Sequence, residues 1–232
     1  RKWAVEKCRG EYISFLDVDD SWFPYKTELQ VKEMLKDDYV LSYGGIVRID
    51  ESSMKSRVSI PRYNSGYLFS ANMFQFEINM PSSMIKKSAL LSKGLNFDES
   101  IKASEEYCLY MQLIYKEKVC VIKTPLAKYL VRSDSLTNAA IDYWSIERLY
   151  TLAKIKERNP EAALEYPDEF REAKNRAVYF KIRYNLERYN IPDARKYARE
   201  IYKESWRYFV IAILLFLSPR LLRRIFKSYY KR

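Results

Sequence analysis

Histidine is absent from the 232 residues of this chain. Its absence excludes histidine-based catalytic triads, histidine zinc sites and histidine general bases from these residues. Any acid or base catalysis must therefore fall to carboxylates, lysine, tyrosine or cysteine.

Cysteine is scarce, since only Cys8, Cys108 and Cys120 are present and none forms a CxxC pair. An odd count without that spacing predicts neither a disulfide framework nor a structural zinc site, and it favours a reducing compartment. No signal peptide is visible. The chain does not begin with Met, and "RKWAVEKCRGEY" reads as the middle of a helix that runs into a strand. We therefore expect the N-terminus of a longer protein to be missing.

The C-terminal region has no apolar run suited to a simple transmembrane span. Tyr208–Leu217 is apolar over ten residues, whereas a spanning helix needs roughly 20. After Pro219, one helix face can gather the apolar side chains Leu221, Leu222, Ile225, Phe226 and Tyr229. Arginine and lysine lie between them, a pattern typical of a helix in the membrane interface. The alternative is a core helix with a solvated basic end.

The net charge of +11 is concentrated at the C-terminus. Residues 195–232 hold eleven Lys or Arg and two Glu, which gives them +9 and leaves +2 for the rest. A nucleic-acid-binding domain should carry its basic surface on the fold itself. The distribution therefore argues against nucleic acid as a partner, and it predicts that residues 206–232 form a basic amphipathic tail that contacts a membrane surface.

Residues 1–137 alternate between strand-like and helix-like segments, which predicts an α/β domain. We expect a buried strand at 11–18, a long strand at 39–50 with a bend or bulge at its paired glycines, and a polar loop at 51–66. A helix should begin near residue 104, and one or two strands should follow from residue 119.

Residues 138–205 contain no glycine and repeat apolar residues at helical spacing. They predict two or three antiparallel helices. These helices either form a cap that packs on the α/β domain or make up a separate module that binds a partner.

The segment "EYISFLDVDDSWFPYK" places three aspartates directly after an apolar run. In α/β folds, the loop after the carboxyl end of a strand is where ligands bind. Asp17 and Asp19 can converge on one hard cation, Mg²⁺ or Mn²⁺, which usually keeps waters and bridges substrate phosphates. In the plainer alternative, Asp20 caps the following helix, with Pro24 in its first turn, and Asp19 is a turn residue.

Two enzyme classes end an apolar strand in D-x-D. In haloacid-dehalogenase-like phosphatases Asp17 would be the nucleophile, but the bulky "WFP" that follows Ser21 is foreign to that pattern, and no later acidic pair convincingly completes the site. The other class is the nucleotide-sugar glycosyltransferases of the GT-A fold.

The stretch "RGEYISFLDVDDSWFPYKTELQV" resembles the family 2 glycosyltransferase pattern "kGeYiaFLDaDDxWxpxKLexQ". "MPSSMIKKSALLSKGLNFDESIKASEEYCLYMQLI" is similar to the second block of that family, and "KYLVRSDSLT" to the third. The resemblance implies the C-terminal part of an inverting GT-A (Rossmann-like) fold over residues 1–137, without its N-terminal third.

The resemblance also implies roles for the first-block aspartates and for the third block. Asp17 would contact the ribose of the nucleotide and, with Asp19, the divalent metal on the diphosphate. Asp20 would support the donor-binding loop and cap the helix. Arg132, where many relatives carry His, would bind diphosphate oxygens. The metal would neutralise charge on the leaving nucleoside diphosphate.

The second block would supply the catalytic base. The family pattern puts the carboxylate that takes the proton of the acceptor hydroxyl at Glu106, preceded by Glu105. The alternative is that both are solvated acids in the first turn of a helix. Cys108 and Gln112 depart from the Asp and Arg usual in this helix, which makes a weakened or altered activity conceivable.

The sequence thus predicts a hexosyltransferase-like enzyme of cell-surface polysaccharide synthesis. It would move a sugar from a nucleotide-diphosphate donor, with UDP favoured, to a glycan or lipid-linked acceptor. It would be cytoplasmic and peripheral on the inner face of the cell membrane. The competing prediction is a catalytically impaired membrane-associated scaffold of the same fold.

Overall fold

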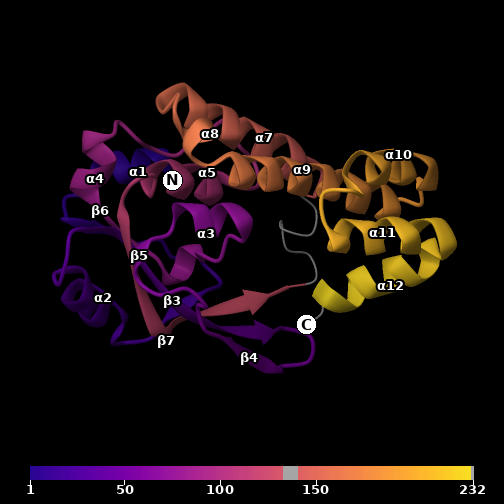
Figure 1. The fold of residues 1–232 in the computed structure, drawn as a ribbon. Coiled ribbons are helices and arrows are strands. Elements are labelled where there is room, and N and C mark those ends of the chain that lie inside the picture. Colours follow the sequence, from indigo (N-terminus) through magenta and orange to yellow (C-terminus); the bar gives the residue numbers. More distant parts are fainter. Residues whose placement is uncertain (133–140, 231–232) are drawn as a thin grey trace.

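The computed structural model describes residues 1–132 and 141–230. Within them, an α/β part is built on a seven-stranded sheet, and a group of helices extends from it (Figure 1). The strands are β1 (Tyr12–Ile13), β2 (Ser21–Trp22), β3 (Tyr39–Asp50), β4 (Ser56–Ser59), β5 (Gly66–Tyr67), β6 (Met84–Lys86) and β7 (Lys118–Val131). Their order is β1-β6-β3-β7-β2, with β4 beside β3 and β5 beside β7. The α/β prediction is confirmed.

The helices of the α/β part are short; the first precedes β1 and the others follow one strand and precede the next along the chain. They are α1 (Lys2–Lys7), α2 (Lys26–Met34), α3 (Phe69–Phe74), the 3-10 turn η1 (Met80–Ser82), α4 (Lys87–Ser92) and α5 (Glu105–Leu113). The helix expected from residue 104 is thus confirmed, with Ser104 at its N-cap position.

The two long strands β3 and β7 run parallel through the middle of the sheet. Their register shifts at Gly44 and Gly45, as the paired glycines predict. A Cβ on Gly44 would lie 2.5 Å from Leu126 Cδ1, and one on Gly45 would lie 2.9 Å from the Ser59 carbonyl oxygen. Only glycine lets the chain approach so closely, so the bulge is specified by these two residues.

The strand expected at 11–18 is much shorter than predicted. Only Tyr12 and Ile13 pair, and they pair with β6. β1 is the end strand of the sheet in the described residues, so the residues after Ile13 gain no ladder hydrogen bonds from a second neighbour. The apolar run instead turns outward, with Leu16 and Val18 exposed.

The helix after the aspartates begins later than predicted. Ser21 and Trp22 form β2 and pair with β7, and α2 begins at Lys26 with Tyr25 at its N-cap position. The expected capping by Asp20 is therefore wrong, because pairing with β7 takes the residues that would have formed the first turn. Residues 56–59, expected to be loop, pair with the outer half of β3 as β4.

The C-terminal helices are α7 (Ile141–Arg158), α8 (Ala162–Glu165), α9 (Pro167–Glu187), α10 (Ile191–Ile201), α11 (Trp206–Leu217) and α12 (Pro219–Tyr230). Leu152, Ile155 and Phe170, from α7 and α9, belong to the same core cluster as the α/β part. These helices therefore pack as a cap on the α/β part. The predicted division at 137 and 205 stays a prediction, and 133–140 lie outside the described residues.

The apolar side chains of α11 and α12 face two ways. Leu215, Leu222 and Phe226 are buried in a second core cluster with α9 and α10. Leu221 and Ile225 are exposed, and the side chain of Tyr229 lies outside the described residues. The single apolar face expected on 221–229 is thus divided, because half of it is covered by the neighbouring helices.

Candidate active site

The three aspartates lie in the turn that connects β1 to β2. The backbone N–H of Asp20 donates to the carbonyl oxygen of Asp17 at 3.1 Å and closes the turn. Val18 at its tip is fully exposed, and Asp17 and Asp19 are exposed beside it. The two carboxylates predicted to meet metal and nucleotide are therefore accessible from solvent.

Asp20 points the other way, toward β7. Its Oδ1 accepts a hydrogen bond from the Leu130 backbone N–H at 3.2 Å. Its Oδ2 is buried and has no hydrogen-bond partner among the described residues. Burial, with the nearby negative charges of Asp19 and Asp17, raises the pKa of Asp20 to about 6 despite the Leu130 hydrogen bond. Asp20 thus fastens the acidic turn to the sheet.

Arg1 connects the two acidic blocks that the sequence separates by about 90 positions. Its Nη2 lies 2.7 Å from Asp17 Oδ1, and its Nη1 pairs with Glu105 Oε1. The N-terminus accordingly lies beside α5 (Figure 1). The structure thereby brings Asp17 and the Glu105–Glu106 pair to one place. Nothing in the sequence indicated that Arg1 would connect them.

Glu106 lines a pocket of about 270 Å³ between the start of α5 and helices α7 and α9. Burial raises the pKa of its carboxyl, the positive charge of Arg1 opposes the shift, and the negative charges of Asp17 and Glu147 add to it. A carboxylate with a raised pKa accepts a proton more readily near neutral pH. Glu106 is therefore chemically suited to act as a general base. Of the two alternatives that the sequence left open, this environment favours a catalytic base over a solvated acid.

Glu147 of α7 holds the segment that leads into α5. Its carboxylate accepts hydrogen bonds from the backbone N–H of Lys102 at 2.7 Å and of Ala103 at 3.2 Å, and from the Ser104 hydroxyl at 2.8 Å. Glu147 is 5% exposed. The cap helices thus fix the start of the helix that carries Glu106, and only the tertiary structure reveals this residue.

Lys26 and Gln30 lie on the buried face of α2, behind the acidic turn. Lys26 Nζ donates to the Ser14 hydroxyl at 3.1 Å and to the Ser83 carbonyl at 3.2 Å, and burial lowers its pKa to about 8. Gln30 donates to the Ser42 hydroxyl at 2.9 Å. The quoted family pattern carries Lys and Gln at these two places, which is the signal that could have found them.

A divalent metal fits this site only in part. Among residues 1–132 and 141–230, no group of three or more Asp, Glu or Cys is arranged to hold a metal. Asp17 and Asp19 are hard oxygen donors of the kind Mg²⁺ and Mn²⁺ take, and such ions commonly complete their shells with substrate phosphates and water. Asp17 is also paired with Arg1. The two carboxylates can contribute to a metal site that substrate oxygens complete.

The remaining predicted or divergent positions are Arg132, two residues after the Leu130 that binds Asp20, and Cys108 and Gln112 inside α5. Arg132 Nε lies 3.9 Å from Glu51 Oε2. The Gln112 amide donates to the Cys108 carbonyl at 2.9 Å, and both residues are buried. The divergent pair of α5 therefore has a packing role, while the proposed contact of Arg132 with the diphosphate stays a prediction. The rest of the third block, 133–137, falls outside the described residues.

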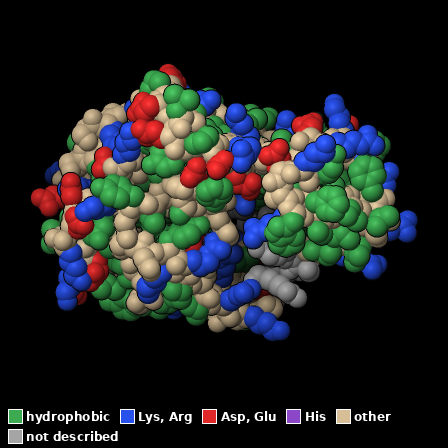
Figure 2. All heavy atoms as spheres, in the orientation of Figure 1, with side chains coloured by type: hydrophobic (Ala, Val, Ile, Leu, Met, Phe, Trp, Pro, Cys, Tyr) green, Lys and Arg blue, Asp and Glu red, His purple; other side chains and the backbone are tan. Residues whose placement is uncertain are grey.

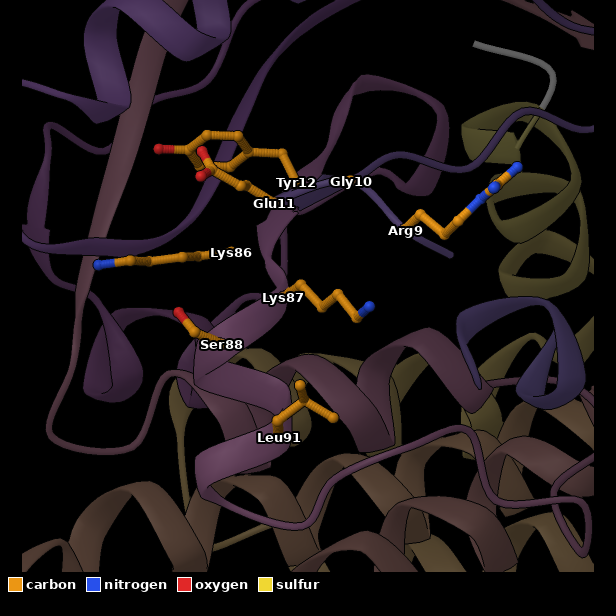
Figure 3. A pocket seen from close by; sticks show the side chains of 8 residues that line it. All are labelled: Arg9, Gly10, Glu11, Tyr12, Lys86, Lys87, Ser88 and Leu91. Carbon is orange, nitrogen blue, oxygen red and sulfur yellow. The ribbon is translucent and has the colours of Figure 1, made fainter. Parts of the chain in front are cut away.

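A second pocket of about 440 Å³ opens beside β1 and β6, and none of the predicted site residues lines it. Figure 3 shows that its cationic side chains diverge, with Lys86 pointing to one side and Arg9 and Lys87 to the other. The backbone N–H of Lys87 donates to the Glu11 carbonyl at 2.8 Å. The larger pocket therefore lacks the convergent polar groups of a binding site, and the smaller one holds the candidate chemistry.

Comparison with known proteins gives a consistent answer. Residues 1–93 match the model of the family described as glycosyl transferase family 2. A Rickettsia bellii protein named as an uncharacterized glycosyltransferase is 36% identical over 142 residues, which are 59% of this chain and 20% of that protein. An Escherichia coli protein, the UDP-Glc:alpha-D-GlcNAc-diphosphoundecaprenol beta-1,3-glucosyltransferase WfgD, is 34% identical over 62 residues, 27% of this chain and 24% of that protein.

Among solved structures, S. aureus TarS 1–349 in complex with UDP matches with a TM-score of 0.57 and 15% identity, over 96% of this chain and 66% of that one. This likeness concerns the fold. The chain spans about a fifth of the length of its Rickettsia bellii relative. The family model, the related sequences and the shared fold agree, so the α/β part of this chain is similar to glycosyl transferase family 2 and has the GT-A fold.

Proposed function

We propose that this chain belongs to an inverting glycosyltransferase that moves a sugar from a nucleotide-diphosphate sugar to an acceptor hydroxyl. The observation that carries the proposal is the Arg1 bridge, which brings Asp17 of the acidic turn and Glu105 of α5 together. The donor-binding acids and the candidate base Glu106 therefore lie at one site. An inverting transfer needs both groups close to the reacting sugar carbon.

On the donor side, Asp17 and Asp19 would hold the nucleotide diphosphate. Both are exposed on a turn that Asp20 ties to Leu130 of β7. A bound Mg²⁺ or Mn²⁺ would neutralise charge on the departing diphosphate. UDP is the favoured nucleotide, because the TarS structure is a UDP complex and WfgD is named for a UDP-Glc donor.

On the acceptor side, Glu106 would accept the proton of the attacking hydroxyl. It lines the 270 Å³ pocket, and burial raises its pKa. Glu147 would keep the start of α5 in place while the proton moves. Glu105, paired with Arg1, would position the acidic turn against Glu106.

We further propose that α11 and α12 contact the inner face of a cell membrane, where a lipid-linked acceptor would be presented. No helix in the described ranges is both long and apolar enough to cross a bilayer. Exposed apolar side chains instead gather on α11, including Trp206, Phe209 and Leu217. Figure 2 shows this hydrophobic area with Lys and Arg around it. Such a surface suits insertion into the interface of an anionic membrane.

The alternative is a scaffold that kept the fold without the activity. The observation in its favour is that the Arg1 guanidinium neutralises Asp17, one of the two carboxylates predicted to meet metal and donor. A scaffold would show neither donor binding nor transfer.

Calorimetric titration of UDP into this chain, with and without Mn²⁺, tests the proposal. We expect binding that requires Mn²⁺ and that weakens at least tenfold in Asp19→Ala, because a charged metal ligand is lost. Asp168→Ala, on the exposed side of α9, is the matched control and should bind as the unchanged protein does. Binding that ignores both Mn²⁺ and Asp19 would contradict the proposal, and no binding at all would favour the scaffold.

A further inference from the structure

The pocket beside Glu106 contains a pair of arginines that the proposed transfer does not use. Arg148 of α7 and Arg176 of α9 line it, together with Trp144 and Phe180. All four come from the cap helices, so the cap supplies one wall of this pocket and the α/β part supplies Glu106. The pocket of about 270 Å³ is close to the lower size of small-molecule sites.

Arg148 is a partly buried cation for which no salt bridge to a carboxylate is found among the described residues. Its Nη1 donates to the Tyr107 hydroxyl at 2.9 Å, and its guanidinium lies 4.2 Å from the Tyr107 ring centroid. Its Nε is buried and has no hydrogen-bond partner in the described chain. A buried charged donor left in this state is costly unless a ligand completes it.

Arg176 adds a second cation to the same wall. Its closest carboxylate is Glu172, at 3.9 Å, and its buried Nε is also without a hydrogen-bond partner in the part of the chain that is described. Burial lowers the pKa of Arg148, and the positive charge of Arg176 adds to this shift. The two guanidinium groups therefore repel each other. An anion between them would relieve the repulsion and accept hydrogen bonds from their unpartnered N–H groups.

Aromatic rings from the cap helices and from the α/β part also line the pocket. The Trp144 and Phe180 rings meet edge to face, with centroids 5.3 Å apart, and Phe76 packs in the same way against Tyr107 at 5.0 Å. Apolar ring faces beside a few fixed polar groups are the usual lining of a site for a small organic ligand. The combination fits a molecule with an apolar or sugar-ring body and one anionic group.

We propose that this pocket is the acceptor subsite and that it takes an acceptor sugar carrying a phosphate or diphosphate, held by Arg148 and Arg176. The proposal rests on the proposed function, since it assigns the acceptor hydroxyl to Glu106. The anionic group binds the cap helices, the sugar ring lies against Trp144 and Phe180, and the attacking hydroxyl faces Glu106. A neutral acceptor of the same sugar would lose the contacts with both arginines.

Glucose 1-phosphate and methyl α-glucoside serve as the charged and neutral probes, with EDTA present so that no metal holds phosphate at the aspartates. Binding is followed by tryptophan fluorescence, and Trp144→Phe should remove most of the signal. We expect glucose 1-phosphate to bind at least tenfold more tightly than the glucoside, because charge-assisted hydrogen bonds are gained. Arg176→Gln and Arg148→Gln should each remove that preference.

Arg171→Gln, a change at an exposed arginine of α9, is the matched control and should keep the preference. Arg148 and Arg176 are both partly buried, so circular dichroism must show that each variant folds, and the two variants give independent readings. Equal binding of the two probes, or a preference that survives both arginine variants, would overturn the subsite.

Titration of UDP with Mn²⁺ into the same variants shows whether the arginines bind a phosphate of the acceptor or the diphosphate of the donor. UDP binding that stays unchanged in Arg148→Gln and Arg176→Gln supports an acceptor phosphate, whereas its loss would assign the arginines to the donor and overturn the proposal. Glucose 1-phosphate binding through the arginines without any UDP binding would support an anionic subsite and contradict the proposed transferase function.

Discussion

The buried lysine of the α/β part and the two pocket arginines of the cap helices differ in how their nitrogen atoms are hydrogen-bonded. In the α/β part, the buried Lys26 is surrounded by hydrogen-bond acceptors from Ser14 and Ser83. In the cap, the buried nitrogen atoms Nε of Arg148 and Arg176 find no acceptor among the described residues. A satisfied buried charge fixes the fold, whereas an unsatisfied one is costly unless a ligand completes it. The difference indicates that the cap does more than cover the sheet.

The two regions also carry opposite charges toward the site. The α/β part contributes the exposed acids Asp17 and Asp19 and the partly buried Glu106, while the cap contributes Arg148 and Arg176. Glu147 is the exception, because this acid of the cap binds the backbone of the α/β part. The four predictions below test what the acids of the α/β part contribute and what the C-terminal helices support.

The largest effect should come from Glu106→Gln. If the α/β part supplies the base, removal of its charge should lower kcat for transfer by at least about 100-fold, because general-base catalysis contributes typically 10²–10⁴-fold. UDP binding with Mn²⁺ should be unchanged. Initial rates with a radiolabelled UDP-sugar measure the first quantity and calorimetry the second. A variant that keeps more than about a tenth of the activity would assign the base elsewhere.

Glu147→Ala should destabilise the protein by about 3 kcal/mol, because three donors lose a charged, buried acceptor. Urea unfolding followed by circular dichroism measures this loss. Glu157→Ala is the control on the same helix, since this exposed residue pairs only with Lys154 among the described residues; a change within about 0.5 kcal/mol is expected. Equal effects of the two variants would mean that the cap does not support α5.

Trp206→Gln combined with Leu217→Gln should weaken binding to vesicles of anionic phospholipid by at least about tenfold, because each large side chain contributes roughly 1.5–3 kcal/mol when it is buried in an apolar environment. Co-sedimentation with vesicles measures the binding. Leu164→Gln, at an equally exposed leucine of α8, should leave it unchanged. If the unchanged protein does not sediment with vesicles, the membrane proposal fails.

The smallest effect should come from Asp20→Asn. The folded pKa of Asp20, about 6, lies above its ordinary value of 3.8, so the folded state binds the proton more tightly than the unfolded state does. Its contribution to stability is therefore present at low pH and is lost as the pH rises from about 4 to 6. At pH 7 the asparagine variant should be more stable by about 1 kcal/mol, since solvent screens this partly exposed group.

Urea unfolding at pH 4, 5, 6 and 7 measures this dependence. The difference between Asp20→Asn and the unchanged protein should be smallest at pH 4 and largest at pH 7. A difference that stays constant over the whole range would show that Asp20 does not titrate in this window.

Local patterns predicted the elements that local chemistry determines. The paired glycines predicted the bulge of β3, and the position of Ser104 predicted the start of α5, because close backbone approach and helix initiation depend on neighbouring residues. The strand at 11–18 and the capping role of Asp20 were wrong because both depend on strand pairing. β1 gains no second neighbour among the described strands, and β7 takes Ser21 and Trp22 into the sheet.

In the candidate site, too, some features could be predicted from the sequence and others could not. The acids Asp17, Asp19 and Glu106 could be named from their motifs, since the residue types and their spacing are written in the sequence. The Arg1 bridge and the support from Glu147 could not. Arg1 and Asp17 are 16 positions apart, and Glu147 and Lys102 are 45 positions apart. In the arginine pocket, Arg148 and Tyr107 are 41 positions apart. No local pattern specifies such partners.

The sequence by itself determined which chemistry is possible in this protein: acid and base work without histidine, a cluster of oxygen donors suited to a metal and a diphosphate, and a basic C-terminus. Only the tertiary structure decided which acids meet, which of them are partly buried, and which arginine N–H groups find no acceptor among the described residues. The physical reason is that residue identity fixes the intrinsic pKa and the bonding capacity of a side chain, whereas burial and long-range partners, which set its actual charge and reach, arise only when the chain folds.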